Sequence, residues 1–483
     1  MFISETNQSI LVLIMLVYGV AILAYSYYFY RRTRTYDSFN MGGRSMPLLP
    51  MILTIVGGAV GGSTVLGFVT NAYLLGMGQI WNVASLAFSV VIFTLFFLKR
   101  IRKAGDEHQL FSVGDYAAIR YGNAARYPAF IGNIAALGAL TGLQFVALAT
   151  VFNLVFGLEM TIGIIVSWIF ITLKTYLGGL TAVIWTDAVQ GTIQTLGITI
   201  LFFFIYFLTG GWSNVSENVS QTADLQAEFL NPFTMPISEI LIPFLTIGAA
   251  TLVRQDMWQR VWAAKNIRTS VISNWLACLV IFITGALVII IGVFANAGLG
   301  IAAEQPNLIY YEVIFGAIPF WFGSVMLIAL VATILSCADS FFIAGSTTMV
   351  SDIIKPLLKV KSDAKLLRYS RLMIIAMSVI SLILALAIPR LVELWMTGSA
   401  ILVAALLAPI LIGMFWEKPG KLAGVASMWS GLILTLVWQF AGQPFGVHPV
   451  FVGFPLSLIV LLAITFFQNN DNSTKNTSED CSA

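Results

Sequence analysis

The chain has 483 residues, of which 59% are hydrophobic and only 10% are charged, with a net charge of +3. Because a water-soluble domain carries roughly 25% charged residues, this composition excludes a soluble protein and predicts one that lies mostly in lipid. The small net charge gives no sign of a nucleic-acid partner, since the basic residues are confined to short loops. The three cysteines show no metal-ligand spacing and no evident pairing.

Apolar runs long enough to cross a bilayer recur along the whole chain. A hydrocarbon core needs roughly 20 apolar residues per helix, and backbone groups in lipid must be paired within the segment. The runs are continuous rather than alternating, which favours helices over a β-barrel. The sequence predicts thirteen transmembrane helices, at 9–30, 48–75, 79–98, 125–156, 160–177, 180–209, 236–252, 270–297, 314–350, 372–389, 393–415, 421–441 and 448–467.

Basic residues alternate between the loops that join these predicted helices. The loops that follow odd-numbered helices hold nearly all Lys and Arg residues, Lys174 among them, and the loop 210–235 holds acidic residues but no basic ones. Cytoplasmic loops carry the excess of Lys and Arg. The pattern therefore predicts an outside N-terminus, an inside C-terminus and a multi-pass protein of the plasma membrane, which is the inner membrane in a Gram-negative cell.

Two of the predicted helices contain residues that disfavour a regular helix. The second helix carries four glycines within the six positions Gly57 to Gly62, and the seventh carries Pro243 and then Gly248. Each glycine costs roughly 1 kcal/mol relative to alanine, although close packing of small residues between helices would also explain them. Interrupted helices at matching places in two halves are typical of transporters, where the unwound backbone binds ions and substrate.

Two carboxylates, Asp187 and Asp339, fall inside predicted helices. A charge in the bilayer costs at least about 2.5–3.5 kcal/mol, so each needs a partner or a bound cation. Either residue could instead have a structural role without a bound cation. Asp187 would then lie at the membrane interface, and Asp339 would form a hydrogen bond to a neighbouring helix. Ser336, Asp339 and Ser340 share one helical face, with Thr333 one turn earlier. Such oxygen ligands suit a hard monovalent cation, although a lone Ser or Thr usually bonds to its own backbone.

Three segments carry a resemblance to a known family: 176–190 (YLGGLTAVIWTDAVQ), 255–265 (QDMWQRVWAAK) and 336–340 (SCADS). With the thirteen spans, they resemble the sodium:solute symporter family, whose members carry proline, sugars, sialic acid, pantothenate or choline. The resemblance covers nearly the whole chain and implies an all-α polytopic membrane protein with a LeuT-type core of two inverted five-helix repeats. The implied divisions are an extra helix and cytoplasmic loop (1–47), the first repeat (48–209), an extracellular loop (210–235), the second repeat (236–415), two C-terminal helices (416–468) and a disordered cytoplasmic tail (469–483).

The same resemblance implies where ions bind. A sodium site would lie between the second and ninth predicted helices, and some family members carry a further cation site. Cys337 stands where the family usually has a second hydroxyl, and a thiol is a poor ligand for Na⁺. The implied positions are Gly57, Val60, Thr333, Ser336 and Cys337 for the sodium site, and Asp187, Ser336, Asp339 and Ser340 for the further cation site.

The solute would lie near the bilayer midplane, beside the interrupted helices. The residues expected there are Gly58, Gln144 and Gly248. Gln144 would alternatively form a bond between helices. Trp81 would form part of a cage for a cationic solute or, alternatively, belong to the aromatic belt at the membrane surface.

These observations predict sodium-coupled symport of a small organic solute by alternating access. The coupling ion would be Na⁺, with no organic cofactor, and a monomer would be the functional unit in the lipid bilayer. The main alternative is a proton-coupled symporter on the same fold, with Asp187 or Asp339 titrating. A channel would need more polar residues per helix to line a pore, and an enzyme would need a nucleophile, a metal or an acid/base pair. The sequence leaves the solute open.

Overall fold

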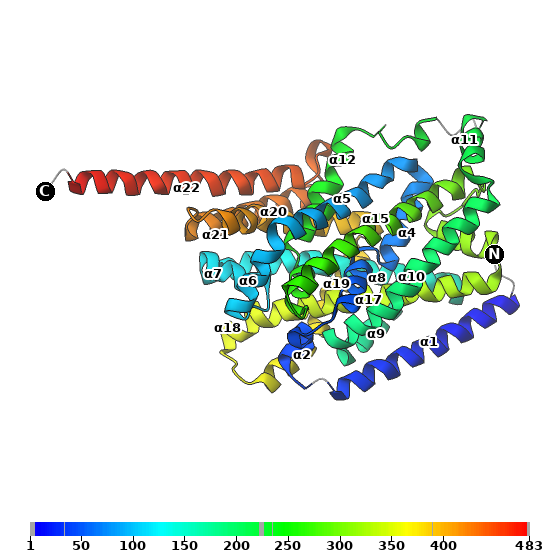
Figure 1. Cartoon of the computed structure of the whole chain (residues 1–483), viewed down its shortest axis with the longest axis horizontal. Helices are drawn as coiled ribbons and strands as arrows, with labels where there is room; N and C mark the ends of the chain where they lie inside the picture. Colours follow the sequence, from blue (N-terminus) through cyan, green and yellow to red (C-terminus); the bar gives the residue numbers. More distant parts are fainter. Residues whose placement is uncertain (1–4, 33, 222–226, 234, 389, 481–483) are drawn as a thin grey trace.

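The computed structural model describes residues 5–32, 34–221, 227–233, 235–388 and 390–480, and the regular elements in these ranges are helices. Figure 1 shows an elongated bundle with α1 along one edge and α22 along the other, the latter extending beyond the body. In chain order the α-helices are α1 Glu5–Arg32, α2 Tyr36–Met41, α3 Leu48–Ala59, α4 Gly62–Leu75, α5 Ile80–Ile92, α6 Leu98–His108, α7 Val113–Tyr121, α8 Arg126–Phe156, α9 Met160–Leu177, α10 Leu180–Leu208, α11 Gly211–Gln221, α12 Ile237–Pro243, α13 Ala249–Val253, α14 Gln255–Ala263, α15 Ile267–Ala297, α16 Ile309–Glu312, α17 Phe320–Met349, α18 Lys355–Leu358, α19 Asp363–Ala387, α20 Leu391–Phe415, α21 Lys421–Phe440 and α22 Val450–Asp480.

The described residues contain eleven helices that are long and apolar enough to cross a membrane, or twelve with the bent pair Ile237–Val253 and Gln255–Ala263. The predicted all-helical membrane fold is confirmed. Each of the thirteen predicted spans falls on helix, but Thr64–His108 forms one continuous helical stretch that extends across two of them. The count of thirteen and the orientation of the termini therefore stay predictions. α22 continues as helix to Asp480, through most of the tail for which the polar composition predicts disorder.

The burial of the helices separates the centre of the bundle from its periphery. The apolar stretch that contains α8 is 94% buried, whereas that of α1 is 22% buried. α8 packs against α9, α17, α19 and α20, and α3 packs against α10 and α15. Since α10 also packs against α17, the glycine-rich helix α3 and the hydroxyl-rich helix α17 meet beside α10 in the interior.

The break predicted in the glycine-rich second span is confirmed. α3 ends at Ala59, Val60 is not helical (φ −108°, ψ 61°), and Gly61 is extended (φ −75°, ψ 169°) before α4 begins. Glycine is needed there because α17 lies very close. A Cβ added at Gly61 would lie 2.4 Å from Cys337 Sγ, and one at Gly62 would lie 2.8 Å from the Leu330 carbonyl oxygen.

The second interrupted span differs from the prediction. After Pro243 the chain forms a π-helical turn, η6 (Phe244–Gly248), and α13 then continues to Val253. The non-helical residue is Arg254 (φ −78°, ψ 133°), with a bend of 41° between the flanking helices. Gly248 instead permits close packing, because a Cβ there would lie 2.9 Å from the Ser85 carbonyl oxygen of α5.

Candidate ion-binding site

The break between α3 and α4 lies against the middle of α17. The Cys337 thiol donates a hydrogen bond to the Gly57 carbonyl over 2.7 Å, and Gln194 of α10 donates to the Val60 carbonyl over 2.9 Å. A Cβ added at Gly57 would lie 4.0 Å from the Ser336 hydroxyl oxygen. Since a carbonyl oxygen has two lone pairs, both carbonyls keep the capacity to contact a cation. The structure thus gathers four of the five residues predicted for a sodium site.

The fifth residue, Thr333, lies one turn before Ser336 on α17. Its hydroxyl donates to the Ala329 carbonyl over 2.8 Å, which is the ordinary backbone bond of a threonine in a membrane helix. The hydroxyl therefore has no free proton to offer a neighbour, although its oxygen keeps lone pairs.

Asp187 of α10 lies at the same place and is only 1% exposed. Its carboxylate accepts hydrogen bonds from Thr54 of α3, over 2.5 Å, and from the Ser336 hydroxyl of α17. Among the described ion pairs none involves Asp187. A buried carboxylate held by two hydroxyls alone keeps a charge that a bound cation would balance. The sequence analysis placed Asp187 and Ser336 together in the further cation position, and the two are bonded to each other. Asp187 also bonds to Thr54 of α3, the helix that ends at the break.

Asp339 of α17 has a different environment. Lys174 of α9 donates to its carboxylate and also, over 3.2 Å, to the Leu335 carbonyl. The Thr175 hydroxyl donates to the second carboxylate oxygen over 2.5 Å. The sequence analysis counted Lys174 with the inside loops. That prediction is wrong, because Lys174 belongs to α9 and its side chain, only 1% exposed, lies within the bundle.

Ser340 also has a charged neighbour. Arg260 of α14 donates to its hydroxyl over 3.0 Å and approaches the Thr54 hydroxyl at 3.4 Å. The same guanidinium pairs with Asp256 over 3.0 Å, and Arg254 pairs with that carboxylate over 2.5 Å. Arg260 therefore lies near Asp187, since both bond to the Thr54 hydroxyl, although the described ion pairs of Arg260 include Asp256 and not Asp187.

The residues proposed for the solute do not all come together. Gly58 faces the guanidinium of Arg260, whose Nη2 would lie 3.0 Å from an added Cβ. Gln144 is buried in α8 and donates to the carbonyl one turn before it. Gly248 packs against α5, as described above. Trp81 contacts Pro232 and the rings of Phe233 and Phe244, at the predicted outer loop rather than at the break.

A cavity of about 460 Å³ with several polar lining residues adjoins Trp81. A second cavity, of about 310 Å³, shares part of its lining. Both therefore lie at the end of the bundle that the charge pattern predicts to face outside. Polar residues of the first cavity include Asn71, Gln79, Glu239, Arg390, Glu393 and His448.

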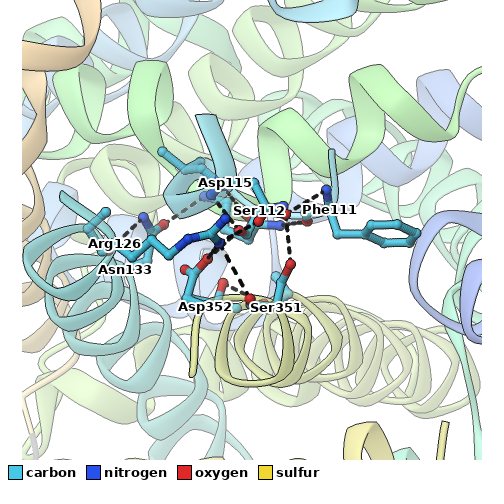
Figure 2. Close-up of polar contacts among 12 residues, drawn as sticks. Phe111, Ser112, Asp115, Arg126, Asn133, Ser351 and Asp352 are labelled. Carbon is cyan, nitrogen blue, oxygen red and sulfur yellow. Dashed lines mark hydrogen bonds and ion pairs between the residues drawn. The ribbon is translucent and has the colours of Figure 1, made fainter. Parts of the chain in front are cut away.

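A dense polar network joins helices at the opposite, basic end (Figure 2). Arg126 of α8 pairs with Asp115 of α7 over 2.5 Å and with Asp352, beyond the end of α17, over 3.5 Å. Asp352 also accepts a bond of 2.5 Å from Ser112, and Asp115 accepts one of 2.7 Å from Ser351. α7, α8 and the C-terminal end of α17 are therefore held together by charge.

The network extends to the second interrupted span. Gln255, directly after the kink at Arg254, bonds to the Val113 N–H over 2.8 Å and to the Phe111 carbonyl over 2.7 Å. Its own N–H donates to Asn133 of α8 over 2.9 Å. The kinked segment is thus fixed to the same cluster that closes this end of the bundle.

Four residues that contact the predicted site residues were not predicted as part of the site: Thr54, Lys174, Thr175 and Arg260. Lys174 carried a usable signal, because a charge inside an apolar run is rare and demands a partner. Arg260 carried none, since it falls between two predicted spans, where a charged residue is ordinary. Thr54 and Thr175 carried none, since hydroxyl residues are common in membrane helices and most of them bond to their own backbone.

Comparisons with known proteins identify the family of the chain. The family model described as sodium:solute symporter family matches residues 39–431. The high-affinity proline transporter PutP of Bacillus subtilis is 22% identical over 84% of this chain and 87% of its own. The sodium/pantothenate symporter of Escherichia coli is 24% identical over 86% and 88%. The human high affinity choline transporter is 24% identical over 82% of this chain and 70% of its own.

Solved structures show the same fold. A Na⁺-coupled sialic acid symporter in a substrate-bound, outward-open state matches with a TM-score of 0.79 at 19% identity, over 96% of this chain and 98% of its own. MhsT in complex with L-phenylalanine matches with a TM-score of 0.51 at 14% identity, over 88% and 98%. The architecture is the LeuT-type fold. Because the family model spans most of its length, the chain belongs to the sodium:solute symporter family.

Proposed function

We propose that this multi-pass plasma-membrane protein, a sodium-coupled symporter, binds its coupling Na⁺ where the break between α3 and α4 touches α17. The observation that carries the proposal is the meeting of three helices at one buried point. The carbonyls of Gly57 and Val60, the Ser336 hydroxyl and the Asp187 carboxylate lie there together. Oxygen donors with one negative charge suit a hard monovalent cation.

The site offers a direct means of coupling. A Na⁺ ion in contact with both the break and Ser336 would hold α3 and α4, the first span of the predicted first repeat, against α17. Removal of the ion would weaken that contact and favour the alternative arrangement. An ion can shift the equilibrium only through its different affinities for the two states.

Two further features support an outward-facing state. The two cavities, which share part of their lining, lie at the predicted outer end, and the Arg126 network closes the predicted inner end. In this arrangement the solute would enter from outside, and opening of the inner end would require Arg126 to leave Asp115 and Asp352.

We propose a small organic solute, in keeping with relatives named for proline, pantothenate and choline. Purified protein in vesicles with an imposed Na⁺ gradient would be screened against amino acids, organic acids, sugars and quaternary amines. Accumulation of one class should require Na⁺. Equal accumulation with potassium or choline in its place, without a pH difference, would contradict the proposal, and accumulation driven by a pH gradient alone would favour the proton-coupled alternative.

A further inference from the structure

Lys174 is an unusual residue for the interior of a membrane helix bundle. It lies on α9 with only 1% of its surface exposed. Its ammonium contacts the Asp339 carboxylate and the Leu335 carbonyl, and Thr175 bonds to the other oxygen of that carboxylate. The ammonium is therefore surrounded by the Asp339 carboxylate and the Leu335 carbonyl oxygen, with the Thr175 hydroxyl bonded to the same carboxylate.

These oxygens are the kinds of ligand that bind a hard monovalent cation. The ammonium supplies the same single positive charge, but it is covalently attached to the chain and cannot dissociate. A buried ion pair is seldom the most stable choice, because well-packed apolar residues of similar size are often as good or better. The presence of Lys174 is therefore better explained by the charge it supplies than by packing.

The two buried carboxylates of this region differ in one respect. Asp339 has a lysine within ion-pair distance, whereas Asp187 has hydroxyl partners and no described ion pair. The further cation position predicted from the sequence also includes Ser336 and Ser340. Ser340 accepts a hydrogen bond from the guanidinium of Arg260. A second mobile cation would thus meet two fixed positive charges.

We infer that the Lys174 ammonium permanently takes the place of a second cation at Asp339, and that the protein consequently couples one Na⁺ per transport cycle. The inference rests on the proposed binding of Na⁺ at Ser336 and Asp187. It makes Lys174 a determinant of ion stoichiometry, acting through the carboxylate that it neutralises. Removal of the ammonium should leave a buried, uncompensated carboxylate that recruits Na⁺ from solution.

The test is a count of bound ions on the full-length purified protein in detergent or nanodiscs, with ²²Na⁺ as the probe. Wild-type protein should bind one Na⁺ per chain without cooperativity. Lys174→Ala should bind two, with a second saturation step or a Hill coefficient above one. Lys174→Ala combined with Asp339→Asn should return to one, because the charge that recruits the second ion is then absent.

The possible results distinguish failure of the inference from failure of the proposed function. Two ions per wild-type chain would overturn the inference alone, and this result needs no variant to fold. No bound Na⁺ in wild-type protein would overturn both. A folded Lys174→Ala protein, judged by size-exclusion chromatography and thermal unfolding, that still binds one ion would show that the pair is only structural.

Discussion

The contact between the helix break and α17 leads to a quantitative prediction for Gly62→Ala. A Cβ at Gly62 would lie 2.4 Å from Ile334 Cγ1 and 2.8 Å from the Leu330 carbonyl oxygen. The isoleucine can rotate, but the carbonyl belongs to the backbone of α17 and cannot move independently. The substitution should therefore push the start of α4 away from α17.

Overpacking of this kind costs about 1–3 kcal/mol. If the full cost falls on the ion-bound arrangement, the Na⁺ dissociation constant should rise about 5- to 150-fold, since 1.4 kcal/mol corresponds to a factor of ten. Equilibrium binding of ²²Na⁺ to the purified variant would measure this change, and thermal unfolding would report any loss of overall stability.

Gly316→Ala is the matched control, because an added Cβ there has no neighbour within 4 Å. It should bind Na⁺ as the wild type does. If Gly62→Ala bound Na⁺ with the same affinity as Gly316→Ala, the break would not need to touch α17 for binding, and the reasoning would be refuted.

Three further predictions follow from the same contacts. Asp187→Asn keeps the shape and most hydrogen-bonding capacity of the side chain but removes its charge. The Na⁺ concentration for half-maximal uptake should therefore rise about tenfold or more, equivalent to about 1.4 kcal/mol. An unchanged dependence of uptake on Na⁺ would leave Asp187 a purely structural role. Arg126→Gln removes a charged donor from the inner network, a loss of about 1.5–3 kcal/mol, and should speed modification of Cys337 by a thiol reagent. Mass spectrometry would separate this modification from that of Cys278 and Cys481, and substitution of an exposed residue, Lys103→Gln, should have no effect. Burial lowers the pKa of His448 to about 4, from about 6.5 in the unfolded chain. Because the unfolded chain takes up the proton first, stability should fall as the pH drops from about 6.5 to 4, and His448→Gln should flatten this part of a plot of Tm against pH.

Much of the fold could be predicted because its causes are local. Length and apolarity identify membrane helices, and the glycines from Gly57 to Gly62 weaken one helix at a recognisable place. The break there is confirmed by the structure. At Gly248 the same reasoning was wrong about the location, since a glycine also serves where another helix passes closely, and sequence alone does not separate the two uses.

The site was harder to predict because it depends on pairings between distant residues. The hydrogen bond from Ser336 to Asp187 spans 149 positions of the chain, and the ion pair of Lys174 with Asp339 spans 165. The helical period places Ser336, Asp339 and Ser340 on one face, but it does not show which neighbouring helix presents a charge to each. Only the packing of α9, α10 and α14 around α17 assigns Lys174, Asp187 and Arg260 to their partners.

The central claim is that Na⁺ binds between the helix break and the Ser336 hydroxyl. Its most direct test is equilibrium binding of ²²Na⁺ to purified Ser336→Ala, with Ser324→Ala as a control. Ser324 is a buried serine of the same helix whose described hydrogen bond goes to the Phe320 carbonyl one turn earlier. The account predicts weaker Na⁺ binding for Ser336→Ala and wild-type binding for Ser324→Ala. Equal affinity in the two variants would contradict it.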